Sequence, residues 1–159
     1  MEAQNQTKKE TKTLVLFFSH TGENYAVGNI TEGNTAILAK MIAAKTRADI
    51  FEVVPEKDYP SKYKPCTDIA LTEKRQNARP AYKGDIDTSK YDTVYIGYPI
   101  WWGDLPMVLY TFLDKHDLNG KTIYPFCTHE GSGMSGTDKN LAKKFPKATV
   151  KAGDRKSVV

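Results

Sequence analysis

Apolar segments of strand length alternate with helical patterns along this chain, and the alternation constrains the fold more than any other sequence feature. Residues 13–18 read TLVLFF, a continuous apolar run typical of a strand that is buried on both faces. Residues 34–46 then follow a helical pattern. We expect four apolar side chains on one face of that helix: Ile37, Leu38, Met41 and Ile42.

The later segments continue the alternation. The further expected strands are residues 49–54, 93–98, 122–127 and 148–151. The further expected helices are residues 67–77, residues 137–145 and, between them, a helix that Asp104 caps and that has Pro106 in its first turn. This order predicts an α/β fold, a doubly wound parallel sheet with helices on both faces. Because no internal repeat is found, we predict one domain over residues 13–159, after a polar leader at residues 1–12.

Length and composition exclude several classes of protein. The chain has 159 residues, which suits one domain with a sizeable core. It contains no run of about 18 apolar residues, so we expect no membrane span. The polar start shows no secretion signal, so we expect a cytoplasmic protein whose leader is disordered or a remnant of trimming or cloning. The net charge of +4 comes from scattered lysines, which favours a solvated surface over nucleic-acid binding.

The two cysteines do not form a metal-binding pattern. Cys66 and Cys127 belong to no Cys-x-x-Cys motif and no Cys/His cluster, so we expect free thiols and no metal site. Cys127 ends an expected strand and has the character of a small buried hydrophobe. Cys66 is expected at the start of a helix, where a thiolate is stabilised, although a structural thiol is the simpler interpretation.

Ligands of a doubly wound sheet bind beyond the carboxyl ends of the strands, where the strand order reverses. The first loop at such an end combines hydroxyls, glycines and backbone N–H groups ahead of a helix, which suits a phosphate. Its candidate residues are Ser19, His20, Thr21, Gly22, Asn34 and Thr35. The spacing matches neither a Walker loop nor a dinucleotide fingerprint. Ordinary helix capping by serine and threonine is the alternative interpretation.

The second loop carries both tryptophans of the chain side by side at a strand end. Its candidate residues are Pro99, Ile100, Trp101, Trp102 and Gly103. Neighbouring strand residues point to opposite sides, so a core strand does not usually end on two tryptophans. A flat aromatic ligand would stack on one of them, and Gly103 would let the backbone approach its ring. The alternative is that the tryptophans fill the core beneath a loop.

The third loop is rich in glycine, which loses much conformational entropy when it is ordered. Such loops often exist so that backbone amides can contact a ligand closely. Its candidate residues are Thr128, His129, Glu130, Gly131, Ser132 and Gly133. A mobile surface loop is the alternative interpretation. Together the three loops place a phosphate-binding segment, an aromatic side chain that can stack on a ligand and a glycine-rich segment at one edge of the sheet. A phosphorylated planar cofactor needs that combination.

These segments resemble the flavodoxin family, and most closely a bacterial branch with a split phosphate loop. The matching stretches are FFSHTGENYAVGNITEGNT, YDTVYIGYPIWWGDLP and GKTIYPFCTHEGSG, and the resemblance covers roughly residues 13–153. It implies a five-stranded sheet in the order 2-1-3-4-5 and one non-covalently bound flavin mononucleotide (FMN). By the same resemblance, the first loop holds the phosphate, the second flanks the isoalloxazine and the third meets its pyrimidine side. Gly103 is then the glycine whose backbone bonds the reduced flavin.

The chain departs from the family pattern in three ways. Residues 25–32 lengthen the phosphate loop. The charge of +4 contrasts with many acidic flavodoxins, so we expect a less negative second reduction potential than in those proteins. Only residues 154–159 follow the last expected strand, which is too short for the fifth helix of the family. We expect a bare apolar face near that sheet edge, which would favour self-association.

Two functions fit this reading of the sequence. An electron carrier would use FMN to pass electrons between redox partner proteins, with no catalytic residue of its own. An FMN-dependent NAD(P)H oxidoreductase would reduce a small quinone-like acceptor, and the third loop has no tyrosine or tryptophan to cover the second flavin face. A phospho-receiver is disfavoured because the first and third strands end on Phe18-Ser19 and Tyr98-Pro99 rather than on acidic residues. A degenerate domain that has lost FMN remains an alternative.

Overall fold

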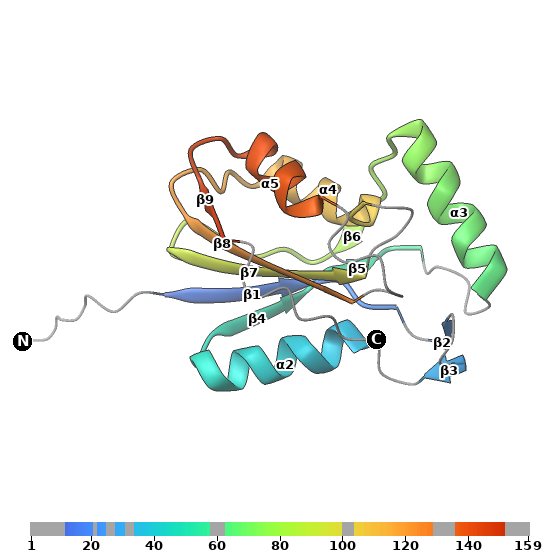
Figure 1. The fold of residues 1–159 in the computed structure, drawn as a ribbon, viewed down its shortest axis with the longest axis horizontal. Helices are drawn as coiled ribbons and strands as arrows, with labels where there is room; N and C mark the ends of the chain where they lie inside the picture. Colours follow the sequence, from blue (N-terminus) through green and yellow to red (C-terminus); the bar gives the residue numbers. More distant parts are fainter. Residues whose placement is uncertain are drawn as a thin grey trace, which may run out of the picture.

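The computed structural model describes residues 12–20, 22–24, 28–30, 34–57, 63–99, 104–128 and 136–151. Five parallel strands form the central sheet: β1 (Thr13–Phe17), β4 (Asp49–Glu52), β7 (Thr93–Pro99), β8 (Thr122–Thr128) and β9 (Thr149–Val150). Their order is β4-β1-β7-β8-β9, which is 2-1-3-4-5 in chain order (Figure 1). The expected sheet and its strand order are therefore confirmed.

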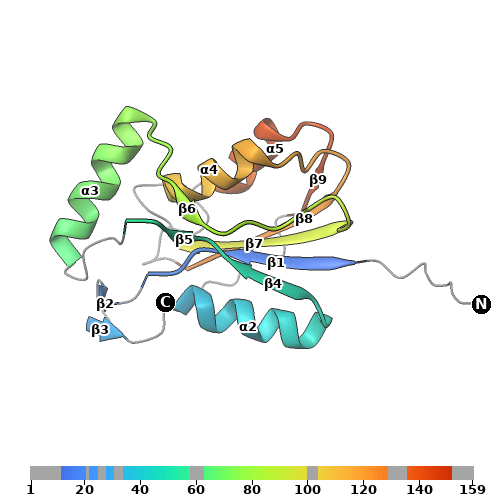
Figure 2. The same cartoon turned by 180° about the vertical axis from the view of Figure 1, so that it is seen from behind.

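Helices cover the two faces of the sheet unequally. The described ranges contain four helices: α2 (Asn34–Thr46), α3 (Tyr63–Gln76), α4 (Met107–Lys115) and α5 (Thr137–Lys144). Figures 1 and 2 show α2 on one face and α4 and α5 on the other, with α3 standing to the side of α4 and α5. No helix in these ranges combines the length and the apolar composition that crossing a membrane requires.

Two short antiparallel pairs were not expected. They are β2 (Gly22–Asn24) with β3 (Gly28–Ile30), and β5 (Val54–Pro55) with β6 (Tyr82–Lys83). The second pair divides the strand expected at residues 49–54. Strand β4 ends at Glu52, and the Val53 amide still donates to the Phe17 carbonyl oxygen of β1 at 2.7 Å. Strand β5 then begins at Val54 and pairs with β6 instead of β1.

The alternation of side chains along β1 explains its continuous apolar sequence. Leu14 and Leu16 are buried in the cluster beneath α4, while Val15 and Phe17 are buried in the cluster beneath α2. Successive strand residues point to opposite faces, so a strand covered on both sides needs apolar residues at every position. The sequence-based interpretation of this strand is confirmed.

Only part of the apolar face predicted for α2 contacts the sheet. Ile37 and Met41 are 43% and 54% exposed, whereas Thr35, Ala36 and Ala39 are buried. Ala36 and Ala39 are three positions apart, so they share a face of the helix. Ile42 packs against the same cluster from a partly buried position. The expectation that one apolar face of the helix is buried is therefore wrong for Ile37 and Met41.

Helix α3 begins earlier than expected, at Tyr63 rather than at residue 67. Pro65 lies in its first turn, where a missing backbone N–H removes no hydrogen bond within the helix. Pro65 is therefore compatible with the first turn of this helix, and the helix does not have to begin after it.

Candidate functional site

The carboxyl ends of β1, β7 and β8 meet at one edge of the sheet because the three strands are parallel neighbours. Phe17 lies in register with Gly97, and Pro99 lies in register with Thr128. The three loops singled out in the sequence therefore leave the sheet from the same edge, which is also where the order reverses between β1 and β7.

The structure describes only part of the predicted flavin site. Its described members are Ser19, His20, Gly22, Asn34, Thr35, Pro99 and Thr128. The other predicted residues lie outside the described ranges: Thr21, Ile100, Trp101, Trp102, Gly103, His129, Glu130, Gly131, Ser132 and Gly133. Their assignment to the flavin stays a prediction from the sequence.

Ser19 joins the end of β1 to the start of α2. Its Oγ accepts a hydrogen bond from the Ala36 amide at 3.2 Å, across 17 positions of sequence. The contact gives Ser19 the capping role that was the alternative interpretation, and it leaves the hydroxyl hydrogen available to donate to an anion. The first turn of α2 contains no acidic residue. The positive end of the helix dipole therefore faces the first loop without a carboxylate from that turn.

A buried hydroxyl pair connects the second and third loops. The Tyr98 hydroxyl lies 2.8 Å from Thr137 Oγ1, and both residues are 0% exposed. Tyr98 stands just before the second loop, and Thr137 opens α5 just after the third. Burial raises the pKa of Tyr98 well above its usual range, so the pair is uncharged. Sequence reasoning missed this pair because no local pattern links residues 39 positions apart.

Asp104 directly follows the second loop in the sequence and accepts three hydrogen bonds. Its Oδ1 accepts hydrogen bonds from the Leu105 amide at 2.8 Å, the Tyr110 hydroxyl at 2.7 Å and the Asn140 side-chain amide at 3.1 Å. The expected capping role is wrong: α4 begins at Met107 with Pro106 at its cap position, and no side chain caps it. Asp104 instead ties the loop to both α4 and α5.

The two cysteines are free, as expected, and both are buried. Burial, with a smaller contribution from Glu73, raises the pKa of the Cys66 thiol to about 11. Burial also raises the pKa of the Cys127 thiol to about 11. The idea of a stabilised Cys66 thiolate is therefore wrong, and both side chains act as buried thiols. Within the part of the chain that the structure describes, no three acidic, histidine or cysteine side chains gather to hold a metal ion.

Comparison with solved structures identifies proteins of the same fold. A candidate flavoprotein of Bacteroides eggerthii is 31% identical with a TM-score of 0.72, over 89% of this chain and 86% of that chain. A candidate flavoprotein of Bacteroides uniformis is 31% identical with a TM-score of 0.72, over 90% and 88%. A flavoprotein of Lactobacillus acidophilus, solved in complex with FMN, is 25% identical with a TM-score of 0.70, over 89% and 90%.

Sequence comparison agrees with the structural one. No curated relative matches the chain. The flavodoxin family profile matches residues 12–157, nearly the whole chain. This match agrees with the strand order of the sheet and with the loops at the edge where that order reverses. The chain belongs to the flavodoxin family.

Proposed function

We propose that this chain binds one FMN non-covalently and passes electrons between redox partner proteins. The observation that carries the proposal is the meeting of the β1, β7 and β8 carboxyl ends at one edge, in a fold shared with a flavoprotein solved with FMN. When bound, FMN supplies one- and two-electron transfer, and the protein supplies binding, orientation and electrostatics.

The described residues suit the phosphate end of FMN. The amino-terminal end of α2 offers backbone N–H groups, and the Ser19 hydroxyl lies beside them through its bond with Ala36. This set of donors, with no acidic residue in the first turn of the helix, favours an anion. Asn34 and Thr35 would contribute from the helix start, and His20 from the end of β1.

The second and third loops would hold the ring system. In this proposal Trp101 or Trp102 stacks on the isoalloxazine, and the backbone of residues 128–133 contacts its pyrimidine side. The Tyr98–Thr137 hydroxyl pair holds the bases of both loops at a fixed separation. A fixed separation would preorganise the two loops for a rigid planar ligand.

Flavin fluorescence tests the binding step. We expect FMN added to the purified chain to lose its fluorescence at a ratio of one flavin per chain. Riboflavin, which lacks the phosphate, should bind about tenfold or more weakly if the α2 terminus holds that group. Undiminished FMN fluorescence at saturating protein would overturn the proposal and would favour a domain that has lost its flavin.

Anaerobic addition of NADH or NADPH separates the two redox functions. An electron carrier should keep its yellow flavin absorbance for many minutes, because it has no site that positions nicotinamide over the ring. Rapid bleaching would favour the alternative, an FMN-dependent NAD(P)H oxidoreductase acting on a quinone-like acceptor. That alternative rests on the absence of tyrosine and tryptophan from residues 128–136.

The net charge of +4 leads to a further expectation about the potentials. The second electron adds negative charge to the bound cofactor, and a less acidic protein opposes that charge less. We therefore expect a less negative second reduction potential than in an acidic flavodoxin, measured by potentiometric titration under the same conditions. An equal or more negative value would contradict this expectation.

A further inference from the structure

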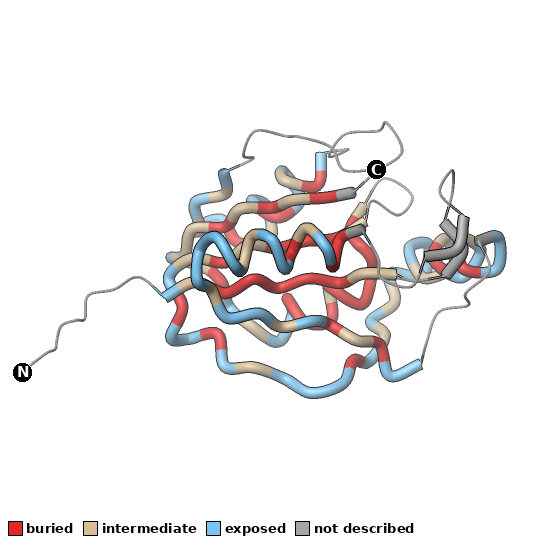
Figure 3. Tube along the Cα trace, turned by 90° about the horizontal axis from the view of Figure 1, so that it is seen from below, coloured by how far each residue is buried: buried red, intermediate tan, exposed pale blue. Residues whose placement is uncertain are grey.

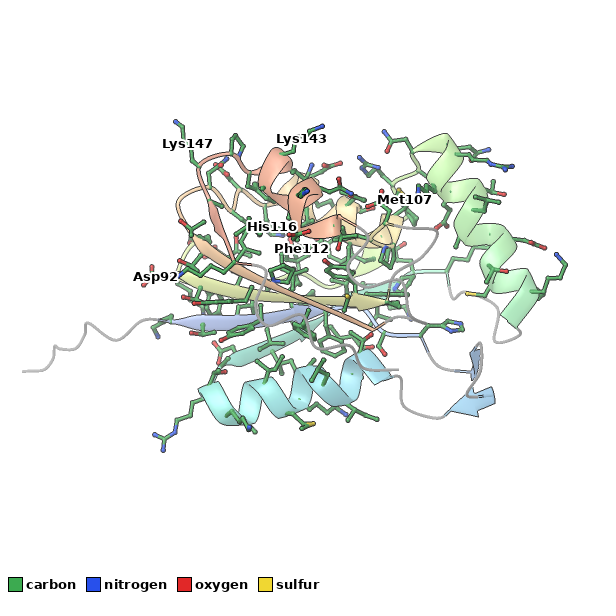
Figure 4. All side chains as sticks on the ribbon, viewed as in Figure 1. Asp92, Met107, Phe112, His116, Lys143 and Lys147 are labelled. Atoms are coloured by element: carbon green, nitrogen blue, oxygen red, sulfur yellow. The ribbon has the colours of Figure 1, made fainter. Side chains whose placement is uncertain are left out.

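A hollow of about 400 Å³ lies where the end of α3, the start of α4 and helix α5 come together. Lys74 and Arg79 line it from the α3 side, Met107 from α4, and Lys143 and Lys144 from α5. Figure 4 labels Met107 and Lys143 on the two helices that border it. Its volume falls within the range of small-molecule sites.

Cations outnumber carboxylates around this hollow. Lys74, Arg79, Lys143 and Lys144 line it, and Asp104 is the one carboxylate among its lining residues. Asp114, just outside, is shared by Arg79 at 2.6 Å and Lys144 at 2.5 Å. Cations therefore outnumber carboxylates among the residues that line the hollow, even though Asp114 pairs with two of them. A phosphate monoester carries a charge of about −1.5 to −2 near neutral pH, and a hollow lined mainly by cations favours such an anion.

Two of the cations are held in fixed positions. The Arg79 guanidinium donates to the Asn77 and Ala78 carbonyl oxygens, and it lies 5.3 Å from the centre of the Tyr110 ring. Asp114 holds the Lys144 ammonium. A cation that is already positioned loses little conformational entropy when an anion binds.

Lys143 differs from Arg79 and Lys144. It forms no ion pair with any residue in the described ranges, and its side chain lines the hollow from an exposed position on α5. Its charge is therefore available to a ligand at little cost. Asn140, one turn before it on α5, also lines the hollow, and its side-chain amide already donates to Asp104 Oδ1.

We propose that this hollow binds the phosphate group of a small ligand, at a site separate from the α2 terminus. The ligand is either free phosphate or pyrophosphate, or a nucleotide whose phosphate enters the hollow. The site goes beyond flavin binding and does not depend on it, because none of its lining residues is assigned to FMN. Asp104 borders both the hollow and the end of the second loop, so an occupied hollow would lie next to the proposed flavin site.

The test uses the full chain saturated with FMN, at low ionic strength, and follows backbone amide resonances by NMR. Pyrophosphate should shift the resonances of Arg79, Asn140 and Lys143 in a saturable way. Replacing Lys143 by glutamine should weaken binding about threefold, and adding Lys74→Gln should bring the loss to about tenfold. Lys139→Gln is the matched control, because Lys139 lies exposed on α5 outside the hollow and its loss should change affinity less than about twofold.

Further ligands distinguish the source of the phosphate. Tighter binding of 2′-AMP and NADPH than of NADH would assign the hollow to a nucleotide 2′-phosphate. Equal affinity for pyrophosphate and the nucleotides would assign it to a free phosphate group. The proposal is overturned if no phosphate compound shifts these resonances, if Lys139→Gln weakens binding as much as Lys143→Gln, or if only a glutamate-rich peptide binds. Urea denaturation of each variant shows whether it is folded, and the α5 substitutions leave the ion pairs of Asp114 in place.

Discussion

The two faces of the sheet are built in different ways. The face beneath α4 and α5 buries large side chains, among them Leu109, Phe112 and Ile123, in one continuous cluster. The face beneath α2 buries Val15 and Phe17 against alanines of the helix. Figure 3, seen from the α2 side, shows this partly exposed helix lying across the buried strands. The buried cluster beneath α4 and α5 is therefore much larger than the one beneath α2, which includes two alanines of the helix.

The two faces also differ in how far their aromatic side chains are buried. Tyr95, Tyr124 and Phe126 stand on the α2 face and are only half-buried, and the rings of Tyr95 and Tyr124 stack with their centres 4.9 Å apart. On the α4 face Tyr98 and Phe112 are buried, while Phe51 and Tyr110 are partly buried. We infer that the α4 face supplies most of the apolar stabilisation and holds the loops, while the α2 face leaves aromatic surface accessible to solvent.

Replacing Phe112 by alanine should have the largest effect. Phe112 is 0% exposed and contacts the rings of Phe51, Tyr82 and His116 at centre distances of 5.7, 5.5 and 4.1 Å. Figure 4 labels Phe112 and His116 where α4 faces the sheet. We expect a loss of about 3–5 kcal/mol in the free energy of unfolding, measured with urea. Tyr124→Ala on the other face should cost about 1 kcal/mol, and equal losses would refute the contrast between the faces.

Gly97 tests packing on the α2 face. A Cβ atom on Gly97 would lie 2.1 Å from Phe126 Cζ, so the ring of Phe126 occupies the space that any side chain here would need. We expect Gly97→Ala to cost about 1–3 kcal/mol in unfolding free energy. In a Phe126→Ala background the same substitution should cost much less, which a double-mutant cycle measures. An unchanged cost in that background would mean that the ring is not the obstacle.

Tyr98→Phe tests whether the α4 face holds the loops. The change removes the hydroxyl that bonds Thr137 and should cost about 1 kcal/mol of stability. If the pair positions both loops, FMN affinity should also fall by a few-fold, measured by fluorescence titration. Tyr95→Phe is the matched control, since Tyr95 lies on the same strand but points to the α2 face. A similar loss of FMN affinity in both variants would argue against a specific role for Tyr98.

The fold was largely predictable from the sequence because each strand and helix leaves a local pattern. TLVLFF predicted a strand buried on both faces, and the alternation of elements predicted the sheet. The buried positions of α2 were not fully predictable from apolar character, because Ala36 and Ala39 are buried while the larger Ile37 and Met41 are exposed. The Asp104 network and the Tyr98–Thr137 pair also escaped prediction, because they form between elements that only the folded chain brings together.

The half-buried aromatic residues of the α2 face lead to a proposal about self-association. We propose that the half-buried aromatic side chains of the α2 face, Tyr95, Tyr124 and Phe126, support weak contact between copies of the chain. Replacing Tyr124 by lysine should weaken that contact about fivefold, because it removes apolar surface and adds repulsion between like charges. Sedimentation over a range of concentrations measures the effect. A wild-type chain that stays monomeric at every concentration would contradict the proposal.

Asp114 should give the smallest effect, at the solvent-exposed border of the α4 face. Hydrogen bonds from Lys144 and then from Arg79 hold the pKa of Asp114 below its usual value of 3.8. A carboxylate with a lowered pKa stabilises the folded chain above the pKa of the unfolded state, and the contribution is lost as pH falls through the folded pKa. The side chain is 40% exposed, so solvent screening limits the contribution to less than about 1 kcal/mol. Asp114→Asn should therefore lower stability slightly at pH 7 and bring the two unfolding free energies together as the solution is acidified below about pH 4. A difference that stays constant between neutral and acid pH would show that packing around Asp114, rather than its charge, accounts for its effect.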